Sequence, residues 1–302
     1  MFLMYFQRKG QFFLLVILLF ILTSCSSSGG SHGESNARDQ SNGNKDEIVI
    51  GQINWPENIA VTNMWKAILE DEGYDVELTL IEMGPQMVAL AEGDIDVAPE
   101  VWLPVQDRSY YEEYKDDVNF AEEPWYDNGR VGLVVPEYID SIDSIEDLNE
   151  NKDMFDSEIT GFEPGAGTME VTSDVIDEYH LDYNLVESSE AVMISAIKDA
   201  IEKKEPIVAP LWKPHYIFAD VDLKFLDDPK NTYGDTEKIY LATRKDFDSD
   251  YEEVYQWMEN WILTDDQLSD LMLYVNEDEN DPMKGARKWI EENEDIIETW
   301  ME

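Results

Sequence analysis

Three tryptophans, Trp55, Trp102 and Trp212, are the side chains whose type and position most directly suggest a binding chemistry. Each stands at the C-terminal end of a segment that we predict to be a strand, with a proline next to it or one residue further on. In open α/β sheets this edge is where ligands bind. Aromatic faces hold cations that offer no hydrogen-bond donors, such as quaternary ammonium groups, through the ring quadrupole. The three indoles therefore predict a site for such a cation.

Most of the remaining tryptophans are predicted to lie in the hydrophobic core. Trp65 shares a helix face with Ile68 and Leu69, and Trp257 and Trp261 are spaced i, i+4. Most tryptophans in globular proteins are largely buried, so packing is the default interpretation for them. Trp289 and Trp300, on the predicted terminal helices, are interpreted as core residues in the same way. Trp125, beside a predicted hinge, could belong to either the core or the site.

A second motif could bind an anion. The segment Glu163–Thr168 (Glu-Pro-Gly-Ala-Gly-Thr) joins a predicted strand to a predicted helix. Free N–H groups at a helix N-terminus attract anions, so Gly167 and Thr168 could receive a carboxylate. A tight turn with Thr168 as the N-cap explains the same residues equally well. With a cation site beside it, this motif would suit a zwitterion.

Enzyme and metal signatures are lacking in the sequence. It contains no Gly-x-Ser-x-Gly, no Walker loop and no His-Glu-x-x-His. Of the three histidines, His32 lies in the expected tether, and His180 and His215 have no nucleophile nearby in sequence. The acidic run 277–281 lacks the glycine and the distant glutamate of a calcium loop and is expected to be a solvated turn. We expect no enzyme, no cofactor and no metal; a secreted hydrolase whose site only the fold assembles is the alternative from another class.

The body of the chain alternates strands and helices, which predicts an α/β protein with a parallel, helix-covered sheet. The expected strands are 47–53, 75–81, 95–101, 131–135, 159–162, 206–211 and 238–243. The expected helices are 59–69, 84–91, 144–148, 168–179, 191–203, 251–263, 264–275, 282–292 and a last piece through Trp300.

Two such blocks suggest two lobes facing each other across a cleft. The expected division is 47–127 plus 236–302 for the first lobe and 128–235 for the second. The chain would cross between them near 126–129 and 231–234, where Gly and Asn supply hinge-like flexibility.

The N-terminus is a targeting signal. Arg8 and Lys9 precede the apolar run 12–22, which is too short to span a bilayer and typical of a signal peptide. Cys25, the only cysteine, follows Leu22-Thr-Ser in a pattern similar to the lipobox of bacterial lipoproteins; a stray cysteine after a cleaved signal peptide is the alternative. We expect a signal peptide over 1–24, a lipidated Cys25 and a flexible tether over 25–46, which hold the body on the extracytoplasmic face of the cell membrane.

Composition excludes some partners. The 302 residues carry 21 Lys+Arg against 68 Asp+Glu, a formal net charge of −47. Nucleic acid is not an expected partner, because binding phosphates requires a basic face. Such a self-repelling surface suits a saline or alkaline habitat, where salt screens it, although an ordinary acidic secreted protein is also compatible.

Several motifs, in order, resemble the OpuAC-type substrate-binding proteins of ABC importers for glycine betaine and related compounds. They are Asn54–Thr62, Glu72–Tyr74, Glu92–Asp96, Glu100–Pro104, Glu163–Gly167, Leu211–His215 and Asp222–Lys230. The resemblance implies a two-lobed periplasmic-binding-protein fold of type II, a ligand cage of Trp55, Trp102 and Trp212, and a carboxylate held by Gly167 and Thr168. It also implies capture of a quaternary ammonium osmoprotectant, closure of the lobes about a hinge, and delivery to a membrane permease.

Three positions leave the ligand open. Some betaine-binding relatives place a His after the Trp-Leu-Pro motif, where this chain has Asp107, and a carboxylate there would repel another. Glu57 resembles an acid that choline-binding relatives use near the alcohol. Asp107 and Glu57 both favour choline, the alternative ligand to glycine betaine, but they do not decide between the two. His215 is a further candidate contact, although a structural histidine beside Trp212 explains it better.

Overall fold

The computed structural model describes residues 47–277 and 281–302. The predicted signal peptide, Cys25, the tether and most of the acidic run 277–281 therefore lie outside the described residues. Within the described ranges, no helix combines the length and the apolar character needed to cross a bilayer.

A mixed sheet forms the framework, with strand order β2-β1-β3-β10-β5-β8. Its strands, with two short ones at its side, are β1 (Glu47–Gln52), β2 (Asp75–Leu80), β3 (Val97–Leu103), β4 (Val118–Phe120), β5 (Tyr126–Pro136), β8 (Ala209–Lys213), β9 (Leu223–Phe225) and β10 (Glu237–Arg244). β1 pairs in parallel with β2 and β3, but β10 is antiparallel to β3 and β5, and β5 is antiparallel to β8 and β9. The expectation of a parallel sheet is right for β1–β3 and wrong beyond them.

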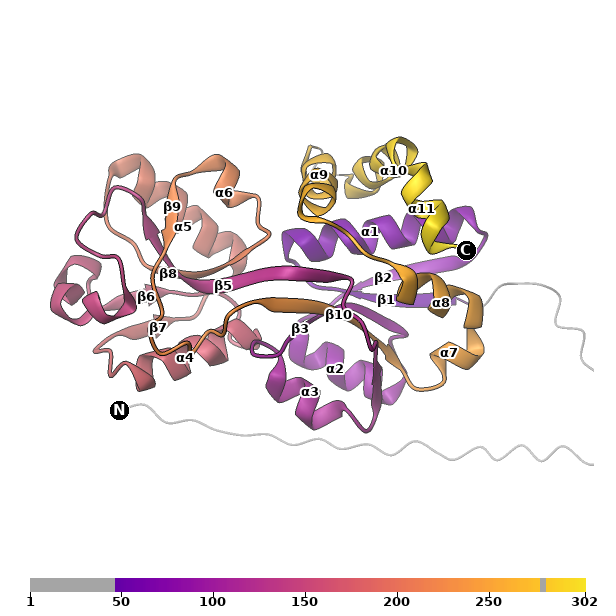
Figure 1. The fold of residues 1–302 in the computed structure, drawn as a ribbon, viewed down its shortest axis with the longest axis horizontal. Coiled ribbons are helices and arrows are strands. Elements are labelled where there is room, and N and C mark those ends of the chain that lie inside the picture. Colours follow the sequence, from indigo (N-terminus) through magenta and orange to yellow (C-terminus); the bar gives the residue numbers. More distant parts are fainter. Residues whose placement is uncertain (1–46, 278–280) are drawn as a thin grey trace, which may run out of the picture. The chain divides into compact units, whose positions relative to one another are not determined.

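The antiparallel pairing follows from how the chain travels. β5 leads from the first group of elements to the second and β10 leads back, so the two neighbours run in opposite directions (Figure 1). A separate pair of parallel strands, β6 (Glu158–Thr160) and β7 (Asn184–Val186), lies in the second group. Helical periodicity and strand alternation locate the elements, but they carry no information on strand direction.

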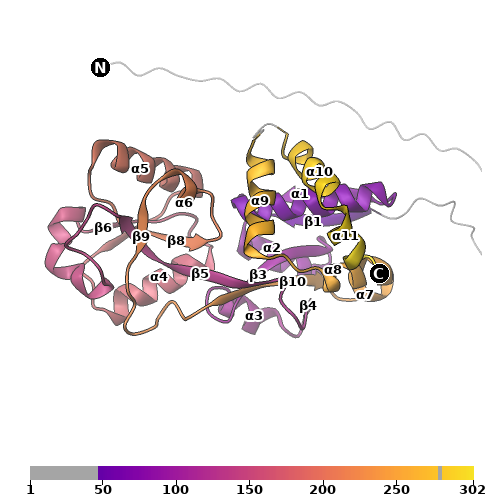
Figure 2. The ribbon, with the colours of Figure 1, turned by 45° about the horizontal axis from the view of Figure 1, so that its top comes forward.

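Helices cover the strands in both groups, as Figures 1 and 2 show. The first group contains α1 (Pro56–Asp71), α2 (Met83–Glu92), α3 (Arg108–Tyr114), α7 (Phe247–Asp250), α8 (Glu252–Asn260), α9 (Asp265–Asn276), α10 (Pro282–Glu292) and α11 (Glu294–Trp300). The second contains α4 (Gly167–Glu178), α5 (Glu190–Lys203), α6 (Ile217–Asp220) and two 3₁₀ helices, Ile145–Asp147 and Asn149–Phe155. The residue boundaries of the two lobes stay a prediction.

Most predicted elements are present within a few residues of their expected ends. The misses are short: α3, α6, α7, the 3₁₀ helix Asn149–Phe155, β4, β7 and β9 were not expected. The expected crossover at 126–129 is the start of β5, the strand that leads from the first group of elements to the second. Elements of three to seven residues contain too few repeats for a periodic signal to emerge.

The indoles assigned to packing do form core. Trp125 stacks on Trp261 with ring centroids 4.2 Å apart, and its indole N–H donates to the carbonyl of Pro99 at 2.6 Å. Trp65 packs against Trp261 and Trp300 at 5.6 and 6.1 Å. The open assignment of Trp125 is thus resolved: it belongs to the core of the first group.

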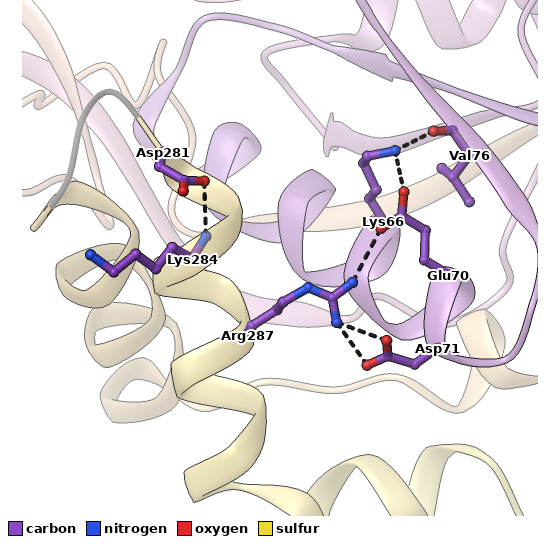
Figure 3. A network of polar contacts seen from close by, with 7 residues as sticks. All are labelled: Lys66, Glu70, Asp71, Val76, Asp281, Lys284 and Arg287. Atoms are coloured by element: carbon purple, nitrogen blue, oxygen red, sulfur yellow. Dashed lines mark hydrogen bonds and ion pairs between the residues drawn. The ribbon is translucent and has the colours of Figure 1, made fainter.

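Helix α10, the last but one of the chain, docks on α1 partly through charges (Figure 3). Arg287 contacts both carboxylate oxygens of Asp71, at 2.7 and 2.9 Å, and Glu70 at 3.2 Å. Glu70 also pairs with Lys66 at 2.7 Å. These side chains are a fifth or more exposed, where each ion pair contributes little, so the network orients the helix more than it stabilises it.

A glycine sets the close packing of α10 on α9. A Cβ at Gly285 would lie 2.1 Å from the carbonyl oxygen of Tyr274, a backbone atom that cannot move without the helix. We expect Gly285→Ala to lower the free energy of unfolding by about 1–3 kcal/mol, since overpacking outweighs the gain in helix propensity of roughly 1 kcal/mol.

Urea denaturation followed by circular dichroism measures this change. Gly165→Ala is the matched control, because the nearest atom to its added Cβ is the Tyr110 hydroxyl at 4.0 Å. Equal stability of the two variants would show that α9 and α10 are not packed as closely as this.

Candidate functional site

Trp55, Trp102 and Trp212 converge on one cavity although they lie far apart in the sequence. Trp55 is the N-cap of α1, Trp102 lies near the end of β3 and Trp212 near the end of β8. All three are more than nine-tenths buried, and the ring centroids of Trp55 and Trp212 are 6.0 Å apart. The two groups of elements thus contribute indoles to the same space.

The cavity encloses about 270 Å³ between atoms, including the solvent at its mouth. Its lining residues are Trp55, Glu57, Trp102, Gln106, Val131, Phe162, Thr168 and Trp212. Phe162 packs on Trp212 with centroids 5.2 Å apart, so a fourth ring borders the space. An apolar, aromatic hollow with few polar groups is typical of a small-molecule site.

Trp102 is held at its backbone and at its side chain. Its N–H donates to Asp107 Oδ2 at 2.7 Å, and its carbonyl accepts from the Asp107 N–H at 2.8 Å. Its indole N–H donates to Glu100 Oε1. Gly129 of β5 lies against the ring, because a Cβ there would be 2.7 Å from Trp102 Cζ3 and 2.9 Å from the Glu237 carbonyl oxygen. The indole therefore has little freedom to rotate.

An acid pair borders the indoles. Glu57 in α1 and Glu100 in β3 are both fully buried. Glu57 lies beside the Trp212 indole and Glu100 beside the Asn58 amide, and the two carboxyl groups are close enough to share a hydrogen bond. Burial raises the pKa of Glu57 well above its usual value, and the neighbouring Glu100 raises it further. Burial likewise raises the pKa of Glu100, while the bonds from Trp102 and Asn58 oppose that shift.

The other end of the cavity is a helix start. Gly167 and Thr168 are the first residues of α4, so their N–H groups have no acceptor within the helix. The N-cap is Ala166, which overturns the alternative of Thr168 as the cap. A Cβ at Gly167 would be 2.0 Å from the Gln106 carbonyl oxygen and 2.6 Å from Asp107 Oδ1. Only glycine lets the loop after β3 come this close.

That loop is anchored by the returning strand. Glu237, at the start of β10, accepts hydrogen bonds from the N–H groups of Val105 at 3.2 Å and Gln106 at 3.1 Å. Asp107 lies behind Gln106 and does not line the cavity. Burial raises the pKa of Asp107 to about 8; the bond from the Trp102 N–H opposes this shift, and Glu100, Glu237 and Glu170 add to it.

His215 lies behind Trp212 rather than in the cavity. Its ring meets Trp212 edge-on at 5.0 Å, its Nε2 contacts Glu190 Oε1 at 3.2 Å, and its Nδ1 accepts from the Ile217 N–H at 3.1 Å. Burial lowers the pKa of His215, with the Glu190 contact opposing the shift. A neutral ring with both nitrogens engaged fits the structural interpretation.

Sequence reasoning missed Gln106, Val131, Phe162 and Glu100. Glu100 and Trp102 are spaced i, i+2 on one strand and so share a face, a signal that the sequence contained. Val131 and Phe162 are apolar residues in predicted strands, and nothing in the sequence distinguishes them from core residues. Only the fold places them at the cavity. In residues 47–277 and 281–302, no group of three or more His, Cys, Asp or Glu side chains is placed to hold a metal ion.

The comparisons with known proteins concern the whole body of the chain. Residues 46–292 match the OpuAC family model, described as the substrate-binding domain of an ABC-type glycine betaine transport system. Two solved structures are similar over nearly their full lengths. The lactococcal OpuAC complex with glycine betaine has a TM-score of 0.80 and 29% identity, over 85% of this chain and 99% of that one. A glycine betaine/L-proline-binding protein from Borrelia burgdorferi has a TM-score of 0.81 and 33% identity, over 84% and 96%.

A curated protein is similar as well. The glycine betaine/carnitine transport binding protein GbuC of Listeria monocytogenes is 44% identical over 145 residues, 47% of this chain and 48% of that protein. In that comparison the chain spans about half the length of the curated relative. The match of the family model, together with the likeness to two-lobed binding proteins, shows that this chain belongs to the OpuAC family, the substrate-binding domains of ABC-type glycine betaine transport systems.

Proposed function

We propose that this protein is the extracytoplasmic substrate-binding protein of an ABC importer and captures a quaternary ammonium compound in the cavity of Trp55, Trp102 and Trp212. The convergence of three buried indoles on one cavity carries the proposal. A trimethylammonium group offers no N–H donors, so it gains most from ring faces, about 1–2 kcal/mol for each desolvated ring. Three rings supply roughly 3–6 kcal/mol, equivalent to millimolar to tens of micromolar affinity.

Glycine betaine is the ligand that uses both ends of the cavity. Its carboxylate would meet the N–H groups of Gly167 and Thr168 at the start of α4, where the helix dipole favours an anion. Asp107, beside this helix start, does not repel the carboxylate while it is protonated. Choline is the alternative, and Glu57 in the cavity wall favours it, because a carboxyl group suits a cation with a hydroxyl better than a zwitterion.

Closure of the lobes would enclose the ligand between them. Tyr110 in α3 donates from its hydroxyl to the Gly165 carbonyl at 2.7 Å, and the Ser109 hydroxyl donates to Glu170 at 2.8 Å. These contacts join the two groups of elements at the side of the cavity. A ligand that touches Trp102 and Trp212 at once favours this arrangement by its differential affinity for it. The permease would then recognise the closed form.

The placement at the membrane completes the proposal. We infer a signal peptide over 1–24, a lipid anchor at Cys25 and a tether over 25–46, with lobes over 47–127 plus 236–302 and over 128–235. A tethered receptor stays near the permease, which raises its effective concentration there.

Isothermal titration calorimetry with glycine betaine, choline, carnitine and proline tests the ligand class. We expect binding of one or more quaternary ammonium compounds, with the ligand recovered unaltered, and weaker binding of proline. Trp102→Ala should raise Kd at least tenfold, because a ring worth about 1–2 kcal/mol is lost along with the wall of the cavity. Trp102→Phe keeps an aromatic face and should lie between the two.

Circular dichroism confirms that each variant is folded. Tight binding that survives Trp102→Ala would rule out the indole cavity as the site, and chemical conversion of a ligand would support the hydrolase alternative instead.

The ratio of the two affinities should depend on pH. As pH rises through about 8, Asp107 loses its proton and its charge opposes a carboxylate at the start of α4. Choline has no carboxylate, so the preference for glycine betaine over choline should fall by the order of tenfold from pH 7 to 9. Titrations of both ligands at each pH measure the ratio, and Asp107→Asn should make it independent of pH. A ratio that stays constant in the unmodified protein would remove Asp107 from the anion end.

Lipidation has its own test. In cells fed a labelled fatty acid, the protein should carry the label and sediment with membranes, whereas Cys25→Ser should lose the label and become soluble. An unlabelled but membrane-bound protein would contradict the lipid anchor.

A further inference from the structure

The acid pair of Glu57 and Glu100 is an unusual wall for an aromatic cavity. The two carboxyl groups come from different elements, α1 and β3, and each has no exposed surface. Glu57 borders the cavity, and its only polar side-chain neighbours among the described residues are the Glu100 carboxyl group and the Trp212 indole N–H, neither of which makes a well-aligned hydrogen bond to it. Glu100 accepts from the indole N–H of Trp102 with one oxygen, and its other oxygen makes no well-aligned hydrogen bond, although the Asn58 amide and Glu57 lie beside the carboxyl group. Buried carboxyl oxygens normally have partners, so this pair calls for an explanation.

The surroundings contain no positive charge that could balance the pair. The groups facing it are the Trp102 indole N–H from β3, the Asn58 amide from α1, the Trp212 indole from β8 and the Asp107 carboxyl group from the loop after β3. No Lys, Arg or His nitrogen lies within 4.0 Å of either carboxyl group in the part of the chain that the structure describes. A buried carboxylate without a counterion is costly, and two side by side cannot both ionise. In the empty site the pair therefore keeps at least one proton.

A bound cation changes this balance, because an opposite charge nearby favours the ionised form of an acid. We propose that the Glu57–Glu100 pair is a proton-exchanging counterion, which releases a proton when a quaternary ammonium group enters the indole cavity. The O–H bond of one carboxyl group breaks, the electron pair stays on its oxygen, and the proton passes to a buffer base in the solvent. The carboxylate left behind neutralises the ligand's charge. This inference rests on the proposed function and deepens it.

Proton release gives the affinity a pH dependence with a defined sign. Below the pKa of the empty pair, binding must include the removal of a proton, so affinity rises with pH. For one proton released, Kd falls by at most tenfold per pH unit, and it levels off once the empty pair is ionised. Choline is the probe, since it has no carboxylate to meet Asp107 at the start of α4. Asp107 still interacts with Glu100, so Asp107→Asn measures how much of the proton release comes from Asp107 itself.

The test is calorimetric titration of the full chain with choline at pH 7.5, in buffers of widely different ionisation enthalpy. The dependence of the observed enthalpy on the buffer gives the number of protons released, which we expect to be about 0.5–1 for each choline bound. A series from pH 5.5 to 8.5 should show Kd falling as pH rises. Choline binding with no proton release, or with Kd independent of pH, would overturn the inference and leave the proposed function intact. Failure to bind any quaternary ammonium compound would overturn both.

Variants identify the source of the proton. The double variant Glu57→Gln/Glu100→Gln keeps the size of both side chains, and its residual choline binding should release no proton at any pH. Glu190→Gln is the matched control: it alters a buried acid outside the cavity and should keep the full release. Thermal unfolding verifies that each variant is folded. Proton release that persists in the double variant, or disappears in Asp107→Asn instead, would overturn the assignment.

Discussion

The reciprocal hydrogen bonding between Trp102 and Asp107 is the interaction on which the site depends. It closes the Trp-Leu-Pro loop at the end of β3 and fixes the backbone of Trp102, from which one indole of the cavity projects. The same loop presses Gln106 and Asp107 against Gly167, at the first turn of α4. One short segment thereby connects the cation end of the cavity to the proposed anion end. Glu237 holds this loop to β10, a strand that crosses between the lobes. A movement of the lobes would therefore displace the loop and change its contacts with a ligand.

The acidic side chains at the surface and those in the site are in different electrostatic environments. The net charge of −47 comes largely from solvated groups, which water and salt screen. Glu57, Glu100 and Asp107 are buried without counterions, and desolvation raises the pKa of each. The surface therefore tells little about the charge of the cavity. A cavity whose buried acids hold their protons more tightly than usual, and could release one to a cation, would suit a ligand that brings a permanent positive charge with it.

Much of the fold could be predicted from local patterns. Apolar spacing located α1, α4, α5 and α8–α10 to within a few residues, and alternation located β1–β3 and β10. The predicted strand directions were wrong for part of the sheet. β5 and β10 pair antiparallel because the chain crosses over and returns, which no local pattern encodes. For the site, Trp55, Trp102 and Trp212 stood out because large rings beside prolines are conspicuous. Val131 and Phe162 did not, since an apolar residue in a strand carries no sign of which cavity it borders.

By itself the sequence determined the class of chemistry: indoles at strand ends, a glycine turn before a helix, and motifs of one family, all of which are local and depend on residue type. Only the tertiary structure decided which of these groups meet. It placed His215 behind Trp212, Asp107 behind Gln106, and Glu100 beside Glu57. The reason is physical: the identity of a side chain sets what it can bind, whereas its burial and neighbours set its charge and its reach, and those arise only when distant strands are brought together.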